Sequence, residues 1–261
     1  MKEMTEELSE NENVIELWTP LEASIDEHYE YEPSNPLFQL CSNLLYYGIA
    51  FPILTILTKL LFHLKIEGKE NLKQVQGGAV SISNHVHFLD CAMVGLAWGK
   101  RKVVYTTQEE SFQIPFVRKL IKLLNAIPIP KSLKSKKAFI HTPDTRPRSM
   151  QAVHHILGQG KVVHFYPEAA LWPYCTKIRK FKNGAFDFAI KNQIPVVPMV
   201  FHFREVQGIR KMWKKKPDIT LTILEPIWEN ELSHIDGFKQ TIQEKMKEVV
   251  SEVEGRKTSK V

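Results

Sequence analysis

Apolar and polar residues alternate along most of the chain in short blocks of two kinds. Continuous apolar runs bounded by turn residues, typical of buried strands, lie at 77–85, 102–107, 161–167, 195–203 and 218–227. Blocks with apolar positions at helical spacing lie at 91–99, 116–126, 149–160, 184–193 and 231–253. Because strands and helices take turns, we expect an α/β fold with a largely parallel central sheet flanked by helices. Sites in such sheets gather at the carboxyl ends of strands, here the loops 84–90, 166–182 and 204–216.

A different pattern precedes this domain. From Leu37 to Thr58 no residue is charged, and the segment is long enough for a membrane span. Gly48 and Pro52 predict a break in its middle. We therefore expect two short helices over 36–65 that lie in a membrane interface, with a pair of core helices as the alternative.

Residues 1–35 differ in charge from the rest of the chain. Residues 1–35 contain eleven acidic residues and one basic residue, and we expect a flexible acidic tail there. The rest of the chain has 34 basic and 18 acidic residues, which predicts an anionic partner: phospholipid headgroups, nucleic acid or phosphorylated substrates. The predicted organisation is a tail over 1–35, apolar helices over 36–65 and a folded domain over 66–261.

Cysteine content and the N-terminus bear on location. The three cysteines are too few and too scattered for a disulfide framework, which favours a reducing compartment. The acidic start is unlike a secretory signal, which begins with basic residues before an apolar run. We expect the protein at the cytoplasmic face of the cell membrane, as a peripheral or monotopic protein.

The motif Asn84-His85-Val86-His87-Phe88-Leu89-Asp90 follows the first apolar strand directly. A histidine is an effective general base near neutral pH when a carboxylate holds its tautomer. If His85 lies in the strand-to-helix turn and Asp90 in the first helical turn, their side chains meet. The new helix would then also present free N–H groups to a developing oxyanion. The alternative is a structural histidine beside a capping aspartate.

Two other patterns suggest different chemistry. His85 and His87 with Asp90 hint at a binuclear metallohydrolase, but the ligand spacing fails, and we expect no metal site. The basic run 210–218 surrounds Trp213 and suits an anionic bilayer, an RNA phosphate chain or a solvated loop. Without a nucleic-acid-binding motif, the membrane is favoured and no nucleic acid partner is expected.

Four blocks in order carry a family resemblance. His85-x4-Asp90 resembles the first motif of the glycerolipid acyltransferases, the family of lysophosphatidate acyltransferase. Residues 109–131 are similar to the family's second block, with Lys131 at its terminal basic position. Tyr166-Pro167-Glu168 resembles the third block, F-P-E-G-T-R-S, and is followed by F-K-N-G-A at 181–185. The segment 194–198 resembles the fourth block.

The resemblance implies an acyltransferase domain over 66–261 with a defined chemistry. His85 would deprotonate the acceptor hydroxyl, oriented by Asp90, and the hydroxyl would attack an acyl thioester directly. No cofactor is implied, and the co-substrate would be acyl-CoA or acyl carrier protein. The implied acceptor is a lysophospholipid such as 1-acylglycerol-3-phosphate. The implied substrate-binding residues are Lys131, Glu168, Lys177, Arg179, Lys182 and Gly184.

The third block departs from the family pattern. It continues Glu168-Ala169-Ala170-Leu171-Trp172, so the family's arginine is missing, and Lys131 replaces another arginine. Both changes fall on the acceptor side. They leave two alternatives open: an acyltransferase for another lysolipid or a glycolipid, and a non-catalytic lipid-binding protein of the same fold.

Overall fold

The computed structural model describes residues 29–108, 115–129, 145–212, 214, 216–229, 231 and 234–258. The predicted binding residue Lys131 lies outside these ranges, as do residues 1–28 of the predicted tail and Trp213 of the basic run.

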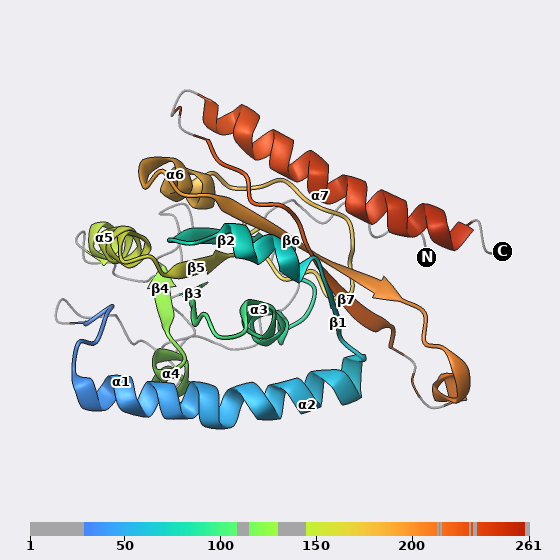
Figure 1. Cartoon of the computed structure of the whole chain (residues 1–261), viewed down its shortest axis with the longest axis horizontal. Helices are drawn as coiled ribbons and strands as arrows, with labels where there is room; N and C mark the ends of the chain where they lie inside the picture. The colour runs from blue at the N-terminus through green and yellow to red at the C-terminus, as the bar shows by residue number, and fades with distance from the viewer. Residues whose placement is uncertain are drawn as a thin grey trace.

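The centre of the molecule is one seven-stranded sheet (Figure 1). Its strands are β1 (Lys65–Glu67), β2 (Ala79–Ser83), β3 (Val103–Gln108), β4 (Ala126–Ile129), β5 (Val162–Phe165), β6 (Val196–Arg204) and β7 (Asp218–Ile223). They follow the order β1-β7-β6-β2-β5-β3-β4, and every neighbouring pair is parallel except β6 with β7. This confirms the expected α/β fold with a largely parallel sheet.

Helices cover both faces of the sheet. On one face pack α5 (Thr145–Gly158), α6 (Gly184–Lys191) and α7 (Ile235–Thr258), and on the other α3 (Asp90–Trp98) (Figure 1). The central strand β2 is buried along its whole length, as expected of a parallel strand covered on both faces. Only glycine fits at position 78, just before β2, because a Cβ there would lie 2.3 Å from the Leu157 carbonyl oxygen.

The apolar segment forms one long helix rather than the two that were predicted. It is continuous from Pro36 to Phe62, as α1 (Pro36–Asn43), a π-helical segment η1 (Leu44–Ala50) and α2 (Phe51–Phe62). The π turn removes the expected break at Pro52. The Phe51 N–H bonds back five residues to the Tyr46 carbonyl, and this wider turn accommodates the proline ring. By length and composition the helix is able to cross a membrane.

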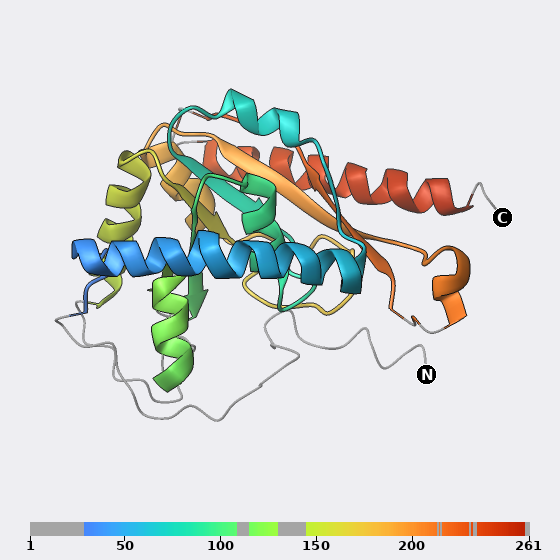
Figure 2. The same ribbon diagram turned by 60° about the horizontal axis from the view of Figure 1, so that its bottom comes forward.

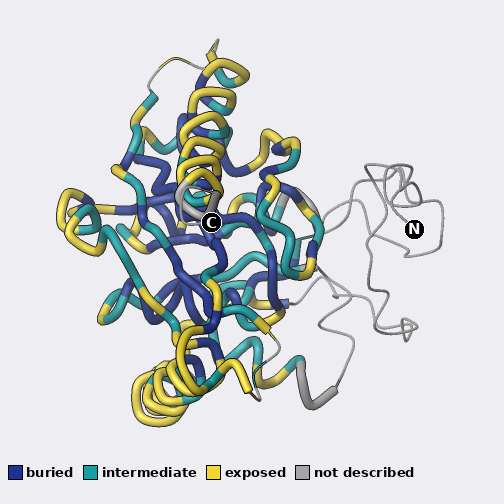
Figure 3. Tube along the Cα trace, turned by 90° about the vertical axis from the view of Figure 1, so that its right-hand side faces the viewer, coloured by how far each residue is buried: buried dark blue, intermediate teal, exposed yellow. Residues whose placement is uncertain are grey.

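This helix lies along the molecule beside α3 instead of projecting from it (Figures 1 and 2). Its inward face carries Ser42, Tyr46, Thr58 and Phe62, which are buried. Much of the rest of its surface is exposed, and most of the exposed side chains are apolar (Figure 3). The large exposed side chains are Leu37, Leu40, Leu44, Tyr47, Ile49, Ile53, Ile56, Leu60 and Leu61.

Several predicted boundaries differ from the structure. Residues 29–35 pack against the domain instead of forming free tail, because Tyr29 is buried and Glu32 contacts His155. A short strand, β1, crosses the predicted boundary between apolar segment and domain by pairing with β7. The helix predicted at 116–126 is α4 (Pro115–Leu123), since Ala126 already begins β4. The terminal helix begins later than predicted, at Ile235.

Candidate active site

The turn between β2 and α3 is anchored to the neighbouring strand by Asn84. Its side-chain amide donates to the Phe201 carbonyl at 2.9 Å, and its oxygen accepts from the Phe201 N–H at 2.8 Å. Asn84 is buried, so this paired contact is shielded from water. The next residue, His85, therefore leaves the sheet at a fixed position.

His85 and Asp90 meet across this turn, as their spacing suggested. The distance from His85 Nδ1 to Asp90 Oδ2 is 3.0 Å. Because an ionised carboxylate only accepts, Nδ1 carries the proton and Nε2 has the free lone pair. The His85 side chain keeps about a fifth of its surface exposed, whereas the Asp90 side chain is fully buried. The pair thus has a sealed carboxylate and an accessible imidazole.

Asp90 also organises the backbone of the turn. Its Oδ2 accepts from the N–H groups of Val86 at 2.7 Å and His87 at 2.9 Å. These two N–H groups belong to the turn before α3, so their bonds to the carboxylate do not bear on the expectation that the first N–H groups of α3 serve an oxyanion. Burial raises the pKa of Asp90, while the hydrogen bonds with His85 and the two N–H groups act in the opposite direction.

The loop after β5 closes over the turn, as the carboxyl-end rule predicted. The Trp172 N–H donates to the His85 carbonyl at 2.8 Å, and the Tyr174 N–H donates to the Val86 carbonyl at 3.0 Å. The Tyr166 ring stacks on the His85 ring with centroids 3.9 Å apart and planes 20° from parallel. Sequence reasoning did not assign Tyr166 a role, although its place directly before Pro167 and Glu168 at a strand end was the available signal.

Glu168 lies in the same loop and is buried. Its Oε1 accepts from the Arg179 N–H at 3.1 Å. Burial raises the pKa of the Glu168 carboxyl to about 7, although the backbone N–H groups of Arg179 and His85 counteract this. At neutral pH this group is therefore present in both protonated and ionised forms, close to the histidine.

Arg179 is the predicted cation that the structure brings into this loop cluster. Its guanidinium carbon lies 3.5 Å from the centre of the Trp172 ring, a cation–π contact. Lys177 and Lys182 are exposed, and the Lys182 N–H bonds to the Pro167 carbonyl. Gly184 begins α6 and is exposed, with open space where a side chain would be.

The remaining histidines near the turn have structural partners. His87 Nδ1 accepts from the Leu89 N–H at 3.1 Å, and its ring packs on Phe62. His164 is fully buried, as expected for a packed strand residue, and contacts the hydroxyls of Ser81 and Ser83. Within the described ranges, no group of three or more His, Cys, Asp or Glu side chains is arranged to hold a metal.

The third predicted loop approaches the other two through Lys216, whose Nζ lies 5.1 Å from the centre of the Tyr174 ring. Farther out, Arg210 and Lys214 both pair with Asp218. The short helix η4 (Gly208–Met212), which contains Arg210, exposes Ile209 and Met212. The three loops selected from the sequence thus lie at one edge of the sheet.

Comparisons with known proteins agree with this architecture. The model of the Acyltransferase family matches residues 63–202. A chloroplastic 1-acyl-sn-glycerol-3-phosphate acyltransferase, LPAT1 of Arabidopsis thaliana, is 28% identical over 138 residues, 53% of this chain and 35% of the relative. A 1-acyl-sn-glycerol-3-phosphate acyltransferase of Chlamydomonas reinhardtii is 27% identical over 138 residues, 53% of this chain and 38% of the relative. The chain thus spans just over a third of the length of these curated relatives.

A solved structure shares the fold. The crystal structure of the 1-acyl-sn-glycerophosphate acyltransferase PlsC from Thermotoga maritima superposes with a TM-score of 0.54 at 18% identity. The superposition covers 83% of this chain and 95% of that one. Because the family model spans more than half of the chain, including the turn with His85 and Asp90, the chain belongs to the Acyltransferase family.

Proposed function

We propose that the protein transfers a fatty acyl group from an acyl thioester to a hydroxyl group of a lysophospholipid. The observation that carries this proposal is the His85–Asp90 pair, with its proton on Nδ1 and its Nε2 free of hydrogen bonds to any described residue. A histidine held in this way contributes about 10²- to 10⁴-fold to proton-transfer steps.

The chemistry follows from that tautomer. The acceptor hydroxyl gives its proton to His85 Nε2 while its oxygen forms a bond to the thioester carbonyl carbon. The carbon–sulfur bond then breaks, and the departing sulfur takes the proton from the imidazolium, which restores neutral His85. Asp90 stabilises the transient imidazolium and keeps the ring oriented. The Tyr166 ring stacks on the face of the His85 ring and limits the rotation of the imidazole.

Glu168 and Arg179 form the part of the site that binds the acceptor. Arginine binds phosphate oxygens through a planar fork, and Arg179 is held in place by the Trp172 ring. The relatives are named for 1-acyl-sn-glycerol-3-phosphate, which makes this lysolipid the first acceptor to test. The donor is acyl-CoA or acyl carrier protein, and no resident cofactor enters the scheme.

The long helix suits work at a membrane. Leu60 and Ile56, on its outer side, are 75% and 61% exposed, and a contiguous apolar surface of this kind marks a membrane or protein contact. We place the helix in contact with the cytoplasmic face of the cell membrane, where a lysolipid acceptor and a thioester donor meet.

One observation supports testing a second class of acceptor. Leu171 stands where the family's third block has an arginine, and the nearby cation comes instead from Arg179, eight residues later. A lysolipid other than lysophosphatidate, or a glycolipid, is therefore the second acceptor to test. A protein that binds lysolipid without consuming acyl thioester would correspond to the non-catalytic alternative.

An acceptor screen tests the proposal. Purified wild-type protein, His85→Ala and the control His234→Ala are incubated with labelled acyl thioesters and a panel of lysolipids, and products are identified by mass spectrometry. His234 is exposed and far along the chain from the turn, so its loss leaves turnover unchanged. We expect a labelled diacyl product with the wild type and the control and none with His85→Ala. Equal product from all three proteins would refute the assignment.

A further inference from the structure

A cavity lies at the opposite edge of the sheet from His85. It has a volume of about 410 Å³ and opens between the long helix and the amino-terminal ends of β3, β4 and β5. Residues 31–33 form part of its wall, and Gln39, Asn43 and Tyr47 line it from the long helix. Nothing in the proposed transfer reaction uses this cavity.

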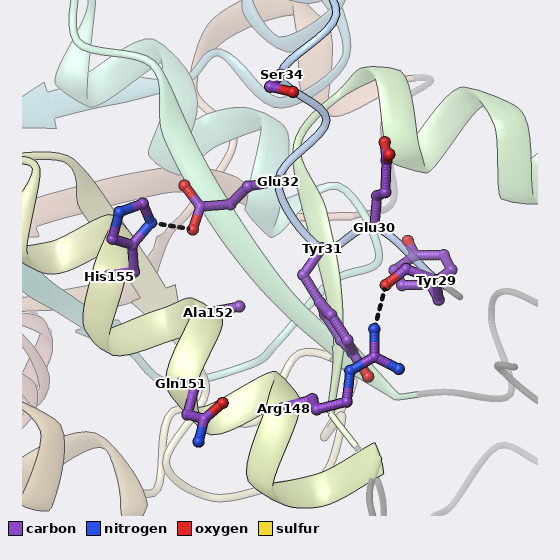
Figure 4. Close-up of a pocket in the computed structure, with 9 residues that line it drawn as sticks. All are labelled: Tyr29, Glu30, Tyr31, Glu32, Ser34, Arg148, Gln151, Ala152 and His155. Carbon is purple, nitrogen blue, oxygen red and sulfur yellow. Dashed lines mark hydrogen bonds and ion pairs between the residues drawn. The ribbon is translucent and has the colours of Figure 1, made fainter. Parts of the chain in front are cut away.

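The wall formed by the N-terminal segment is attached to α5. Figure 4 shows this attachment from the adjoining cavity: Glu32 faces His155, with an oxygen-to-Nδ1 distance of 2.7 Å. Arg148 donates to the Tyr29 carbonyl at 3.1 Å. Glu32 is therefore committed mainly to His155, and Lys161 Nζ lies at 3.8 Å from its second oxygen.

Basic side chains dominate the cavity between the helix and the sheet. Of the described residues that line it, four are cationic and one is a carboxylate: Arg101, Lys102, Lys122 and Lys161, and Glu32. The C-termini of α3, α4 and α5 are near, and each contributes roughly half a negative charge. Three such ends and Glu32 together offset roughly 2.5 of the four positive charges, so the described lining residues keep a net positive charge.

The contacts of the two innermost cations are with neutral groups. Lys102 Nζ donates to Ser42 Oγ at 2.6 Å and Asn43 Oδ1 at 3.2 Å. Arg101 donates to backbone carbonyls, among them that of Gly160 at 3.1 Å. Hydroxyl, amide and carbonyl oxygens satisfy the N–H donors but do not neutralise the charge. Burying a cation without a counter-ion costs free energy, which an anion in the cavity would recover.

The titration of Lys102 is consistent with this surplus of positive charge. Burial, together with repulsion from Lys161, lowers the pKa of the Lys102 ammonium to about 8. A carboxylate neighbour would have acted in the opposite direction.

We infer that this cavity is a binding site for a phosphate group, held by Lys102 and Lys161 as point charges. Its volume exceeds that of a phosphate, so the group enters as part of a larger molecule or with water. The helix that lines the cavity continues into the exposed apolar residues Leu40 and Leu44, where the chains of an anionic phospholipid would lie. A soluble phosphate compound presents the same headgroup chemistry without that contact.

Calorimetric titration of the full chain tests this inference with two probes. The first is inorganic phosphate and the second is dihexanoyl phosphatidate below its micelle concentration. The variants are Lys102→Met with Lys161→Met, and, as a matched control, the exposed Lys247→Met on α7. We expect the wild type and the control to bind at least one probe, and the double variant to bind it at least tenfold more weakly. The near-equal volumes of Met and Lys keep the packing, which a thermal melt verifies.

The two probes separate the sources of the phosphate group. Binding of phosphatidate alone assigns the cavity to a lipid headgroup, and binding of both probes assigns it to phosphate in general. If neither probe binds, or if the double variant binds as tightly as the control, the inference is wrong. The double variant leaves His85 and Arg179 unchanged, so the loss of binding relative to the control reports this cavity and not the proposed acceptor site.

Discussion

Replacing Asp90 by asparagine separates the two tasks of this carboxylate. Its Oδ2 accepts three hydrogen bonds, from His85 Nδ1 and from the N–H groups of Val86 and His87. An amide oxygen at the same position accepts all three, so the turn is preserved. The negative charge that stabilises the imidazolium is lost, and an amide no longer fixes the histidine tautomer as a carboxylate does; the corresponding Asp→Asn substitution in the serine protease triad lowers kcat about 10⁴-fold.

The effect of Asp90→Asn on stability is expected to be small. Hydrogen bonds to a charged acceptor contribute about 1 kcal/mol more each than neutral ones, and the new amide N–H₂ takes the place of Oδ1, which is buried without a partner among the described residues. Against these costs, the neutral amide avoids the desolvation that raises the pKa of Asp90. Asp90→Ala differs, because it leaves two buried N–H groups unpaired, at about 1–3 kcal/mol each.

Thiol release from an acyl thioester and urea denaturation measure the two quantities on the same preparations. We expect Asp90→Asn to lose about 10³- to 10⁴-fold in kcat with a stability within about 2 kcal/mol of the wild type. Asp90→Ala should lose a similar factor in kcat and unfold at clearly lower urea. If Asp90→Asn retained more than a tenth of wild-type turnover, the role assigned to the carboxylate would be wrong.

Three further predictions concern burial and exposure. Because Glu168 has a folded-state pKa of about 7, above its unfolded value, the folded state binds the extra proton, and stability falls as the pH rises from about 4.5 to 7. Glu168→Gln should flatten this slope in denaturation curves measured at successive pH values, and an unchanged slope would contradict the assignment. Burial lowers the pKa of His164 to about 3, so the folded state disfavours the protonated imidazole, and folding stability falls as the pH drops below about 6.5. His164→Gln should therefore reduce the acid sensitivity of the melting temperature. Ile56→Asp with Leu60→Asp should reduce cosedimentation with vesicles at least tenfold at unchanged stability, since both side chains are exposed; equal cosedimentation would show that the helix does not contact the bilayer.

Much of the site was predictable because it depends on local order along the chain. A buried strand followed by a short turn and a helix places residues five apart, such as His85 and Asp90, on the same side of the turn. The rule that sites lie at carboxyl ends of parallel strands then brought in the loop that contains Glu168.

Other features required three-dimensional information. The stacking of Tyr166 on His85 joins residues 81 positions apart, and no periodicity reports such a contact. The π turn at Pro52 depends on a hydrogen bond that the helical repeat does not predict. The hydrogen bonds of Asp90 to the Val86 and His87 N–H groups were not predicted, because the sequence marked Asp90 only as a partner of His85.

The central claim is that the imidazole of His85 takes the proton from the acceptor hydroxyl. The most direct measurement is the single-turnover rate of acyl transfer from a labelled acyl thioester to 1-acylglycerol-3-phosphate or to the acceptor that the screen identifies. His85→Ala and the wild type are compared at equal, saturating concentrations of bound acceptor. The account predicts a rate at least 10²-fold lower for His85→Ala with acceptor binding retained. A rate within threefold of the wild type would contradict it.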